Sequence, residues 1–360
     1  MRLRRSVAVA AAVLGLGGVA PGIAQAAAPA GFVGMVSTDT VVGSQRYQNT
    51  QLTAMRAAGV TLLRQVFDWS VIERKNGVYK FSAYDPVVAA AAKHGIEIMP
   101  ILFNEPSFLS SRPRRRALHG TYPPKNLNTI AAFARAAVRW YGPNGRFWTL
   151  HPTLPRLPIR IWQVWNEPNL NVYWQPRPSA SRYVTLLGVA SRAIHELDHG
   201  AEVVSGGIPQ SPLGINMLTY LREMLHAGAG RWMNTVGINA YSRTASGMIA
   251  LLRGVRTTLD AHGDSHIAIR VTEFGWSDSG PGSIYRLGAA GQAKQIGAVV
   301  RDFYADRNPL GLRGFVYFDW RDGRPYKGEP NFWGLHTGLL KLNGRPKPAL
   351  SAFRSAANSL

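Results

Sequence analysis

PIRIWQVWNEPN, residues Pro158–Asn169, is a run of large apolar and β-branched residues that stops at the polar Asn166-Glu167-Pro168. The run is short and lacks helical spacing, which is typical of a strand buried on both faces, as in a parallel sheet. Pro168 cannot donate to a sheet ladder, so the strand must end there. Glu167 is therefore predicted at the carboxyl end of a buried parallel strand, where α/β folds place their functional side chains.

A second apolar strand ends in the same way. Ile267–Trp276 reads IAIRVTEFGW and stops at Glu273. A single glutamate at a strand end is more often a solvated or salt-bridged loop residue. Two of them, at the ends of two buried strands and beside aromatic residues, predict paired carboxylates for glycoside hydrolysis. In that reaction one acid protonates the leaving oxygen and the other carboxylate faces the anomeric carbon.

Three segments carry a resemblance to a known group of enzymes. They are LLRQVFDWSVIE at Leu62–Glu73, WNEPNLNVYW at Trp165–Trp174 and WGLHTGLLKLNGRPKPAL at Trp333–Leu350. Together with the two strand-end glutamates they resemble glycoside hydrolase clan A, the retaining (β/α)8-barrel glycosidases, and within it family 39; family 5 is the second choice. Family 39 includes xylosidases, iduronidases and bacterial exopolysaccharide endoglycosidases. The resemblance implies that Glu167 is the acid/base and Glu273 the nucleophile.

The whole chain alternates strands with helices, and most of the helices stop at a glycine. Strands are expected at Gly31–Ser37, from Val60, from Ile96, at Pro158–Asn169, from Glu202, at Thr235–Tyr241, at Ile267–Trp276 and at Gly314–Trp320. Helices are expected before Gly59 and at Pro86–His94, Leu127–Tyr141, Ser179–His199 and Pro348–Asn358. This order predicts one closed (β/α)8 barrel. A doubly wound open sheet is the alternative, but Ser37–Thr40 is not the glycine-rich turn that usually follows its first strand.

The first 26 residues predict a secretory signal, because Met1–Arg5 is basic, Val7–Val19 is apolar and Ala24–Ala26 offers small residues to a signal peptidase. An uncleaved membrane anchor is the weaker alternative, since a span needs about 20 apolar residues. Residues 27–360 are then the expected catalytic domain of a secreted or envelope-associated protein without stable membrane insertion. The chain has no cysteine, so its stability must come from a large core, which its 46% hydrophobic composition allows.

The chain is strongly basic. Its formal net charge is +21, and removal of the three arginines in the signal leaves 21 − 3 = +18. Such a charge favours anionic partners. Arg112–Arg116, in the long loop after the third strand, is a candidate contact for an acidic glycan, and a solvated run of charge is the alternative. The expected partner is a carbohydrate, neutral or anionic. No nucleic acid, cofactor or metal is expected, and the protein is expected to be a monomer.

A retaining mechanism also needs residues that support the two carboxylates. The acid must have a raised pKa, and the nucleophile must stay ionised beside cationic or phenolic groups. Arg64 and Tyr241, at the ends of the second and sixth strands, are the candidates; a structural ion pair and simple packing are their alternatives. Asn166 resembles the family's residue that binds the sugar 2-hydroxyl, and Asn104, at the end of the third strand, is a further candidate sugar contact.

Tryptophans follow several of the strands. Trp174, Trp276 and Trp320 come after the fourth, seventh and eighth strands, where flat ring faces can stack on pyranose rings. Each one alone is more often a packing residue, but three at one rim predict a sugar cleft. The core or the cleft wall is the expected place for three others, Trp69, Trp162 and Trp165.

One motif points to a different chemistry. His195–His199 reads HELDH and matches H-E-x-x-H, which on a helix can bind zinc. The predicted helix stops at Gly200, however, and histidines in a last helical turn also interact favourably with the helix dipole. The leading hypothesis is therefore a secreted retaining β-glycosidase. A non-catalytic carbohydrate-binding barrel of the cell envelope is its rival, and a zinc peptidase comes third.

Overall fold

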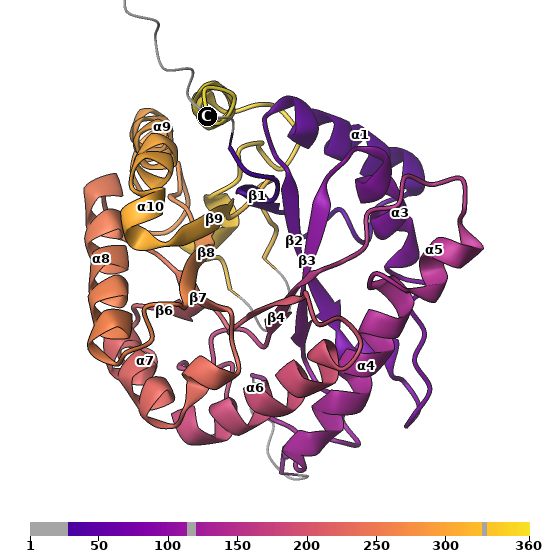
Figure 1. Ribbon diagram of the computed structural model, residues 1–360. Coiled ribbons are helices and arrows are strands. Elements are labelled where there is room, and N and C mark those ends of the chain that lie inside the picture. The colour runs from indigo at the N-terminus through magenta and orange to yellow at the C-terminus, as the bar shows by residue number, and fades with distance from the viewer. Residues whose placement is uncertain (1–27, 114–119, 326–329) are drawn as a thin grey trace, which may run out of the picture.

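The computed structural model describes residues 28–113, 120–325 and 330–360, so the predicted signal at 1–26 and Arg114–Arg116 of the basic run lie outside the described residues. The strands are β1 Val33–Val36, β2 Leu62–Asp68, β3 Glu97–Phe103, β4 Ile161–Val164, β5 Glu202–Val204, β6 Ile208–Pro209, β7 Thr235–Asn239, β8 Ala268–Phe274 and β9 Leu312–Tyr317. All their pairings are parallel, and β1 pairs with both β2 and β9. Because β5 and β6 both pair with β7, they share the fifth position of a closed eight-stranded barrel (Figure 1). The predicted (β/α)8 barrel is confirmed.

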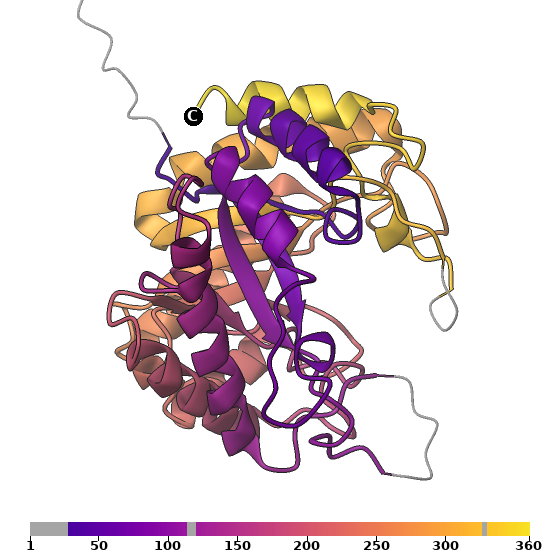
Figure 2. The same cartoon turned by 90° about the vertical axis from the view of Figure 1, so that its right-hand side faces the viewer.

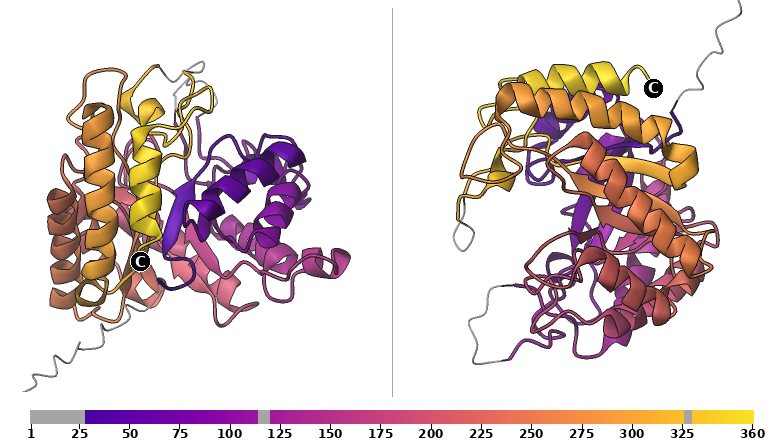
Figure 3. Two further views of the ribbon diagram at one scale, coloured as in Figure 1. Left: turned by 90° about the horizontal axis from the view of Figure 1, so that it is seen from above. Right: turned by 90° about the vertical axis from the view of Figure 1, so that its left-hand side faces the viewer.

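Helices surround the strands (Figure 1). They are α1 Gln45–Ala57, α2 Trp69–Ile72, α3 Asp85–Lys93, α4 Ile130–Tyr141, α5 Arg146–Leu150, α6 Ala180–His195, α7 Met217–His226, α8 Ala245–Ala261, α9 Gly288–Ala305, α10 Arg307–Leu310 and α11 Pro348–Ala357. Figure 2 shows α11 over α1, and Figure 3 shows it beside α9. The Asn358 amide also reaches the Ala57 carbonyl at 3.4 Å. Helix α11 therefore closes the ring of helices between α1 and α9.

Several boundaries differ from the sequence prediction, and two of the differences concern the fifth strand and the helix before it. The fifth strand is interrupted at 205–207, where a Cβ on Gly207 would collide with the side chains of Asn239 and Thr272. The helix predicted to run to His199 ends at His195, and the chain tightens there, because the Leu197 amide donates to the Ile194 carbonyl three residues back at 3.0 Å.

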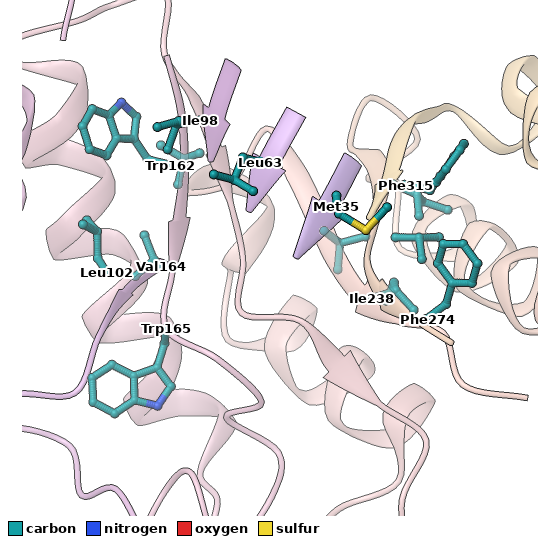
Figure 4. Close-up of a cluster of buried hydrophobic side chains, with 14 of the residues drawn as sticks. Met35, Leu63, Ile98, Leu102, Trp162, Val164, Trp165, Ile238, Phe274 and Phe315 are labelled. Carbon is teal, nitrogen blue, oxygen red and sulfur yellow. The ribbon is translucent and has the colours of Figure 1, made fainter. Parts of the chain in front are cut away.

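The main core lies between the strands and the helices. Phe274 and Phe315, on the neighbouring strands β8 and β9, are among its buried side chains, and Trp162 on β4 belongs to it on another side of the barrel (Figure 4). Burial of each large apolar side chain stabilises the fold by about 1.5–3 kcal/mol. Trp69, Trp162 and Trp165 are all fully buried, as predicted. Within the described ranges, no helix is both long and apolar enough to cross a membrane.

The inside of the barrel is layered along its axis. A small separate apolar cluster fills the middle and consists of Val36, Leu62, Met99, Val204 and Val316, from five different strands. Side chains alternate along a strand, so residues two positions away from these also point into the barrel. Glu97, two residues before Met99, therefore lies below the apolar layer, whereas Arg64, two residues after Leu62, lies above it, at the carboxyl ends of the strands.

A buried ion pair forms the floor below the apolar layer. Arg270 on β8 contacts Glu202 on β5 through Nη2 at 3.2 Å, and its Nη1 donates to the Gly31 carbonyl at 3.0 Å. Thr235 donates to Glu202 Oε1 at 2.8 Å. Burial opposes the ionisation of Glu202, but the charge and hydrogen bonds of Arg270 outweigh it and lower the Glu202 pKa. The charged side chains of this floor thus find their hydrogen-bond and ion-pair partners within the protein.

Replacing Arg270 by Met should destabilise the barrel strongly. The change leaves the buried Glu202 with Thr235 and, as a cation, the half-exposed Arg313 at 3.5 Å, and breaking a buried pair typically costs about 3–5 kcal/mol. Urea unfolding measures this loss. Arg253→Met is the matched control, because Arg253 pairs with Asp306 at 3.1 Å while 67% of its side chain is exposed, and a surface pair contributes about 0–1 kcal/mol. Equal losses in the two variants would contradict the structural role of the floor.

Candidate active site

Glu273 lies near the carboxyl end of β8 and is held at both of its oxygens. Arg64 Nη1 contacts Oε1 at 2.5 Å, and the Tyr241 hydroxyl donates to Oε2 at 3.0 Å. Burial and the nearby carboxylates raise the Tyr241 pKa well above its ordinary value, so this hydroxyl keeps its proton and acts as a donor. A cation and a phenolic hydroxyl thus each contact one oxygen of this carboxylate. The structure thus places both predicted supporting residues on Glu273.

Arg64 connects three strands of the barrel at this end. Besides Glu273 on β8, its Nε donates to Gln163 Oε1 and its Nη2 to Asn166 Oδ1, both at 2.7 Å, at and just after β4. Only 2% of Arg64 is exposed. Because the guanidinium is planar with its donors at fixed angles, these contacts hold Asn166 and Glu273 in a fixed relative position.

Glu167 follows β4 in a strained loop. The strand ends at Val164, three residues earlier than the acid, and both Trp165 and Glu167 have positive φ, 71° and 44°. Such values are uncommon for residues other than glycine and occur most often at functional sites. The Glu167 amide donates to the Gly207 carbonyl at 3.1 Å, which ties this loop to the interrupted fifth strand.

The environment of Glu167 is unlike that of Glu273. Its Oε1 accepts from Asn239 Nδ2 at 2.7 Å, and Thr272 holds Asn239 Oδ1 at the same distance. Burial raises the Glu167 pKa to about 8, and the charge of Glu273 adds to the rise, whereas Asn239 and Arg64 act against it. Glu167 is therefore protonated at neutral pH. Since Oε1 accepts a hydrogen bond, the proton resides on Oε2.

Asn239 and Thr272 were missed by the sequence analysis. Both are completely buried on strands, and buried polar side chains need partners. The polar Asn in TVGINAY and the Thr before Glu273 were the available signals. Their partners are far away in the sequence, so the signal could not have told which residue Asn239 contacts.

Within the described residues, no contact of Asn104 reaches Glu167 or Glu273. Its φ is 63°, and its Nδ2 donates to both carboxylate oxygens of Asp68 at 3.0 Å. Asp68 also caps α2 by accepting from the Ser70 amide at 2.9 Å. The structure thus gives Asn104 a part in shaping the loop beside β2, while Asn166 stands directly at the site.

The prediction of three exposed tryptophan faces is wrong. Trp174, Trp276 and Trp320 are each exposed by 1% or less. The indole N–H of Trp276 donates to the Ser242 carbonyl at 2.8 Å, and that of Trp320 to Gln51 at 2.9 Å. Trp174 packs edge-on against other aromatic rings of the core. Trp320 thus contacts α1 and Trp174 packs on Tyr183 of α6, so the rings are enclosed by packing, which is favourable because it buries much apolar surface.

The H-E-x-x-H motif does not form a metal site here. His199 lies beyond the end of α6, so the two histidines do not share a helical face. The His195 ring nitrogens face the Ser191 and Ala201 carbonyls at 3.0 and 3.2 Å, and Glu196 pairs with Arg135 at 2.6 Å. Across the described part of the chain, no group of three or more His, Asp or Glu side chains could hold a metal ion.

Comparisons with known proteins found solved structures of similar fold. No protein-family model and no curated protein matches the sequence. A family 39 glycoside hydrolase from the gut symbiont Bacteroides cellulosilyticus WH2 has a TM-score of 0.65 and 19% identity over 90% of this chain and 63% of its own. A family 39 β-xylosidase from Caulobacter crescentus gives 0.67 and 18% over 93% and 73%. An exo-β-1,4-mannosidase from Opitutaceae bacterium strain TAV5 gives 0.61 and 16% over 93% and 62%.

These likenesses establish the barrel architecture, which this chain shares with the solved family 39 enzymes. The chain spans less than two thirds of the length of the Bacteroides enzyme and of the mannosidase.

Glu167→Gln should stabilise the protein in a pH-dependent way. The folded-state pKa of about 8 exceeds the value of about 4.3 for an unfolded glutamate, so wild-type stability falls as pH rises from about 4.3 to about 8. Glutamine stays neutral throughout. The variant should match the wild type at pH 4 and exceed it at pH 8 by a few kcal/mol, because each pH unit between the two pKa values contributes about 1.4 kcal/mol. Urea unfolding at several pH values tests this; a constant difference would contradict the raised pKa.

Proposed function

We propose that this protein is a retaining β-glycosidase that hydrolyses O-glycosidic bonds of an oligosaccharide or polysaccharide by double displacement. Glu167 is the acid/base and Glu273 the nucleophile. The observation that carries this proposal is the opposite environment of two carboxyl groups at one end of the barrel. One is buried and has a raised pKa, while the other is held by a cation and a phenol. A pair of carboxyl groups with separated protonation behaviour is what glycoside hydrolysis requires.

The proposed reaction uses each group in turn. Glu167 transfers the proton from Oε2 to the glycosidic oxygen while a Glu273 oxygen attacks the anomeric carbon and the bond to the leaving group breaks. Glu167, now ionised, takes a proton from water, whose oxygen displaces Glu273 and releases the sugar with its original configuration. Asn166 accepts from Arg64 through Oδ1, which leaves its Nδ2 to donate to the sugar 2-hydroxyl. Neither step needs a metal or a cofactor.

The similar structures support a carbohydrate substrate, because they are glycosidases by name, including xylosidases and a mannosidase. Their names differ in the sugar, so the proposal is made at the level of the β-glycosidase class. Export to the cell exterior, through the predicted signal at 1–26, and a monomeric state are parts of the same proposal.

Removing the two carboxylates should have different consequences. Glu273→Ala should abolish turnover of every substrate. Glu167→Ala should keep measurable activity on aryl glycosides with activated leaving groups, which need no proton, and added azide should speed it and yield a β-glycosyl azide. Wild-type hydrolysis followed by NMR should release the β-anomer first. Release of the α-anomer would refute the retaining mechanism, and binding without hydrolysis of any glycoside would favour the carbohydrate-binding barrel.

Asn239→Ala should move the alkaline limb of the pH profile. The hydrogen bond from Asn239 lowers the Glu167 pKa against the effect of burial, so its loss should raise that pKa and keep the acid protonated to higher pH. The profile of kcat/KM against pH reports this pKa in the free enzyme. Asn104→Ala is the control, because its amide contacts Asp68 instead. A limb that stays in place or moves to lower pH in Asn239→Ala would contradict the role of Asn239.

A further inference from the structure

Two partly exposed aromatic side chains lie beside the proposed nucleophile. The ring of Trp333 is 5.2 Å from that of Tyr241, nearly perpendicular to it, and 4.6 Å from that of Tyr285. Tyr241 and Tyr285 are 5.8 Å apart, so the three rings form one cluster. Because the Tyr241 hydroxyl donates to Glu273, the cluster begins one side chain away from the reacting carboxylate.

The segments that carry Tyr285 and Trp333 are fixed by hydrogen bonds. The Tyr285 carbonyl accepts from the Ser277 amide at 3.0 Å. Trp333 begins the short 3₁₀ helix Trp333–His336, whose last carbonyl accepts from the buried Lys347 at 3.2 Å. A surface held in this way loses little conformational entropy when a ligand binds to it.

The polar ends of the two side chains are unused. Within the residues that the structure describes, neither the Tyr285 hydroxyl nor the Trp333 indole N–H makes a hydrogen bond, whereas the indole N–H groups of the buried Trp276 and Trp320 do. Aromatic rings with an apolar face and a free polar end are suited to sugars, since a pyranose presents C–H groups on its faces and hydroxyls at its edge.

Among the described residues, no charged side chain makes a hydrogen bond or a cation–π contact with Tyr285 or Trp333, although Tyr241 of the same cluster contacts Glu273. Burial raises the pKa of Tyr285, so its hydroxyl stays protonated and neutral. Within the described part of the chain, the two rings thus offer aromatic faces to which no charged group is bound, which suits an uncharged ring.

We propose that Tyr285 and Trp333 form a stacking surface for an uncharged pyranose ring of the substrate, next to Glu273. The proposal rests on the proposed glycosidase function and deepens it. It assigns to these two residues the role that the sequence suggested for Trp174, Trp276 and Trp320, and it favours a neutral glycan over the acidic one suggested by the basic run.

Binding to an inactive form of the full chain tests the proposal separately from catalysis. Glu273→Ala is the parent, and neutral xylo-, manno- and cello-oligosaccharides, from tetra- to hexasaccharides, are the probes in isothermal titration calorimetry. Trp333→Ala added to the parent should raise the Kd of the best-bound probe about tenfold, which corresponds to about 1.4 kcal/mol. Tyr285→Ala should act in the same direction, and Trp333→Phe, which keeps a ring face, should lose less.

The matched control is Trp232→Ala. Trp232 is also half-buried, but it precedes β7 at the opposite end of the barrel, where the Arg192 guanidinium lies 4.8 Å from its ring. This change should leave the Kd unaltered, and thermal unfolding followed by circular dichroism checks that each variant is folded.

Each outcome separates the two proposals. Unchanged affinity in folded Trp333→Ala and Tyr285→Ala overturns the stacking surface even if the wild type hydrolyses glycosides, as does failure of the parent to bind any neutral probe. Trp333-dependent binding, with a wild type that hydrolyses no glycoside, supports the surface and refutes the glycosidase. Tighter binding of oligouronates than of every neutral probe, again dependent on Trp333, overturns the preference for an uncharged ring.

Discussion

The buried charge of Arg64 is the constraint on which the site depends. A guanidinium that is almost completely enclosed needs a nearby anion, because an unpaired buried charge costs several kcal/mol. Glu273 supplies that anion at 2.5 Å. One cation compensates one carboxylate, so a second carboxyl group in the same buried region is more stable when it is neutral. The difference between the two carboxyl groups therefore arises from a charge balance among Arg64, Glu273 and Glu167.

A second buried ion pair lies at the other end of the barrel, and the two pairs have different surroundings. Arg270 and Glu202 are satisfied by each other, by Thr235 and by a backbone carbonyl, which makes a closed structural group. The apolar cluster between the two ends separates them. At the upper end, the second carboxyl group and the partly exposed aromatic rings leave contacts that a ligand can complete. This is the usual division of a (β/α)8 barrel, with stability at the amino ends of the strands and chemistry at the carboxyl ends.

The local features of the sequence predicted much of this arrangement. Alternating apolar runs and glycine-terminated helices indicated the barrel, and strand order alone put Glu167 and Glu273 at the same end. A buried arginine needs an anionic partner, and this requirement indicated that Arg64 would contact a carboxylate. The exposure of aromatic residues was not predictable, because Trp276 and Trp333 both follow strands and both have aromatic neighbours in the sequence. Only the paths of the loops bury one and leave the other partly open.

The sequence by itself determined the order of strands and helices, the ends of the strands and the residue types that those ends present, since these follow from hydrophobic periodicity and from the backbone limits of proline and glycine. The tertiary structure alone decided the positive φ of Glu167, the hydrogen bond from Asn239 that selects Oε2 for the proton, and the aromatic cluster beside Tyr241. These depend on barrel closure, which brings side chains from separate strands and loops within hydrogen-bonding and stacking distance, and no local pattern encodes which distant residue will be the partner.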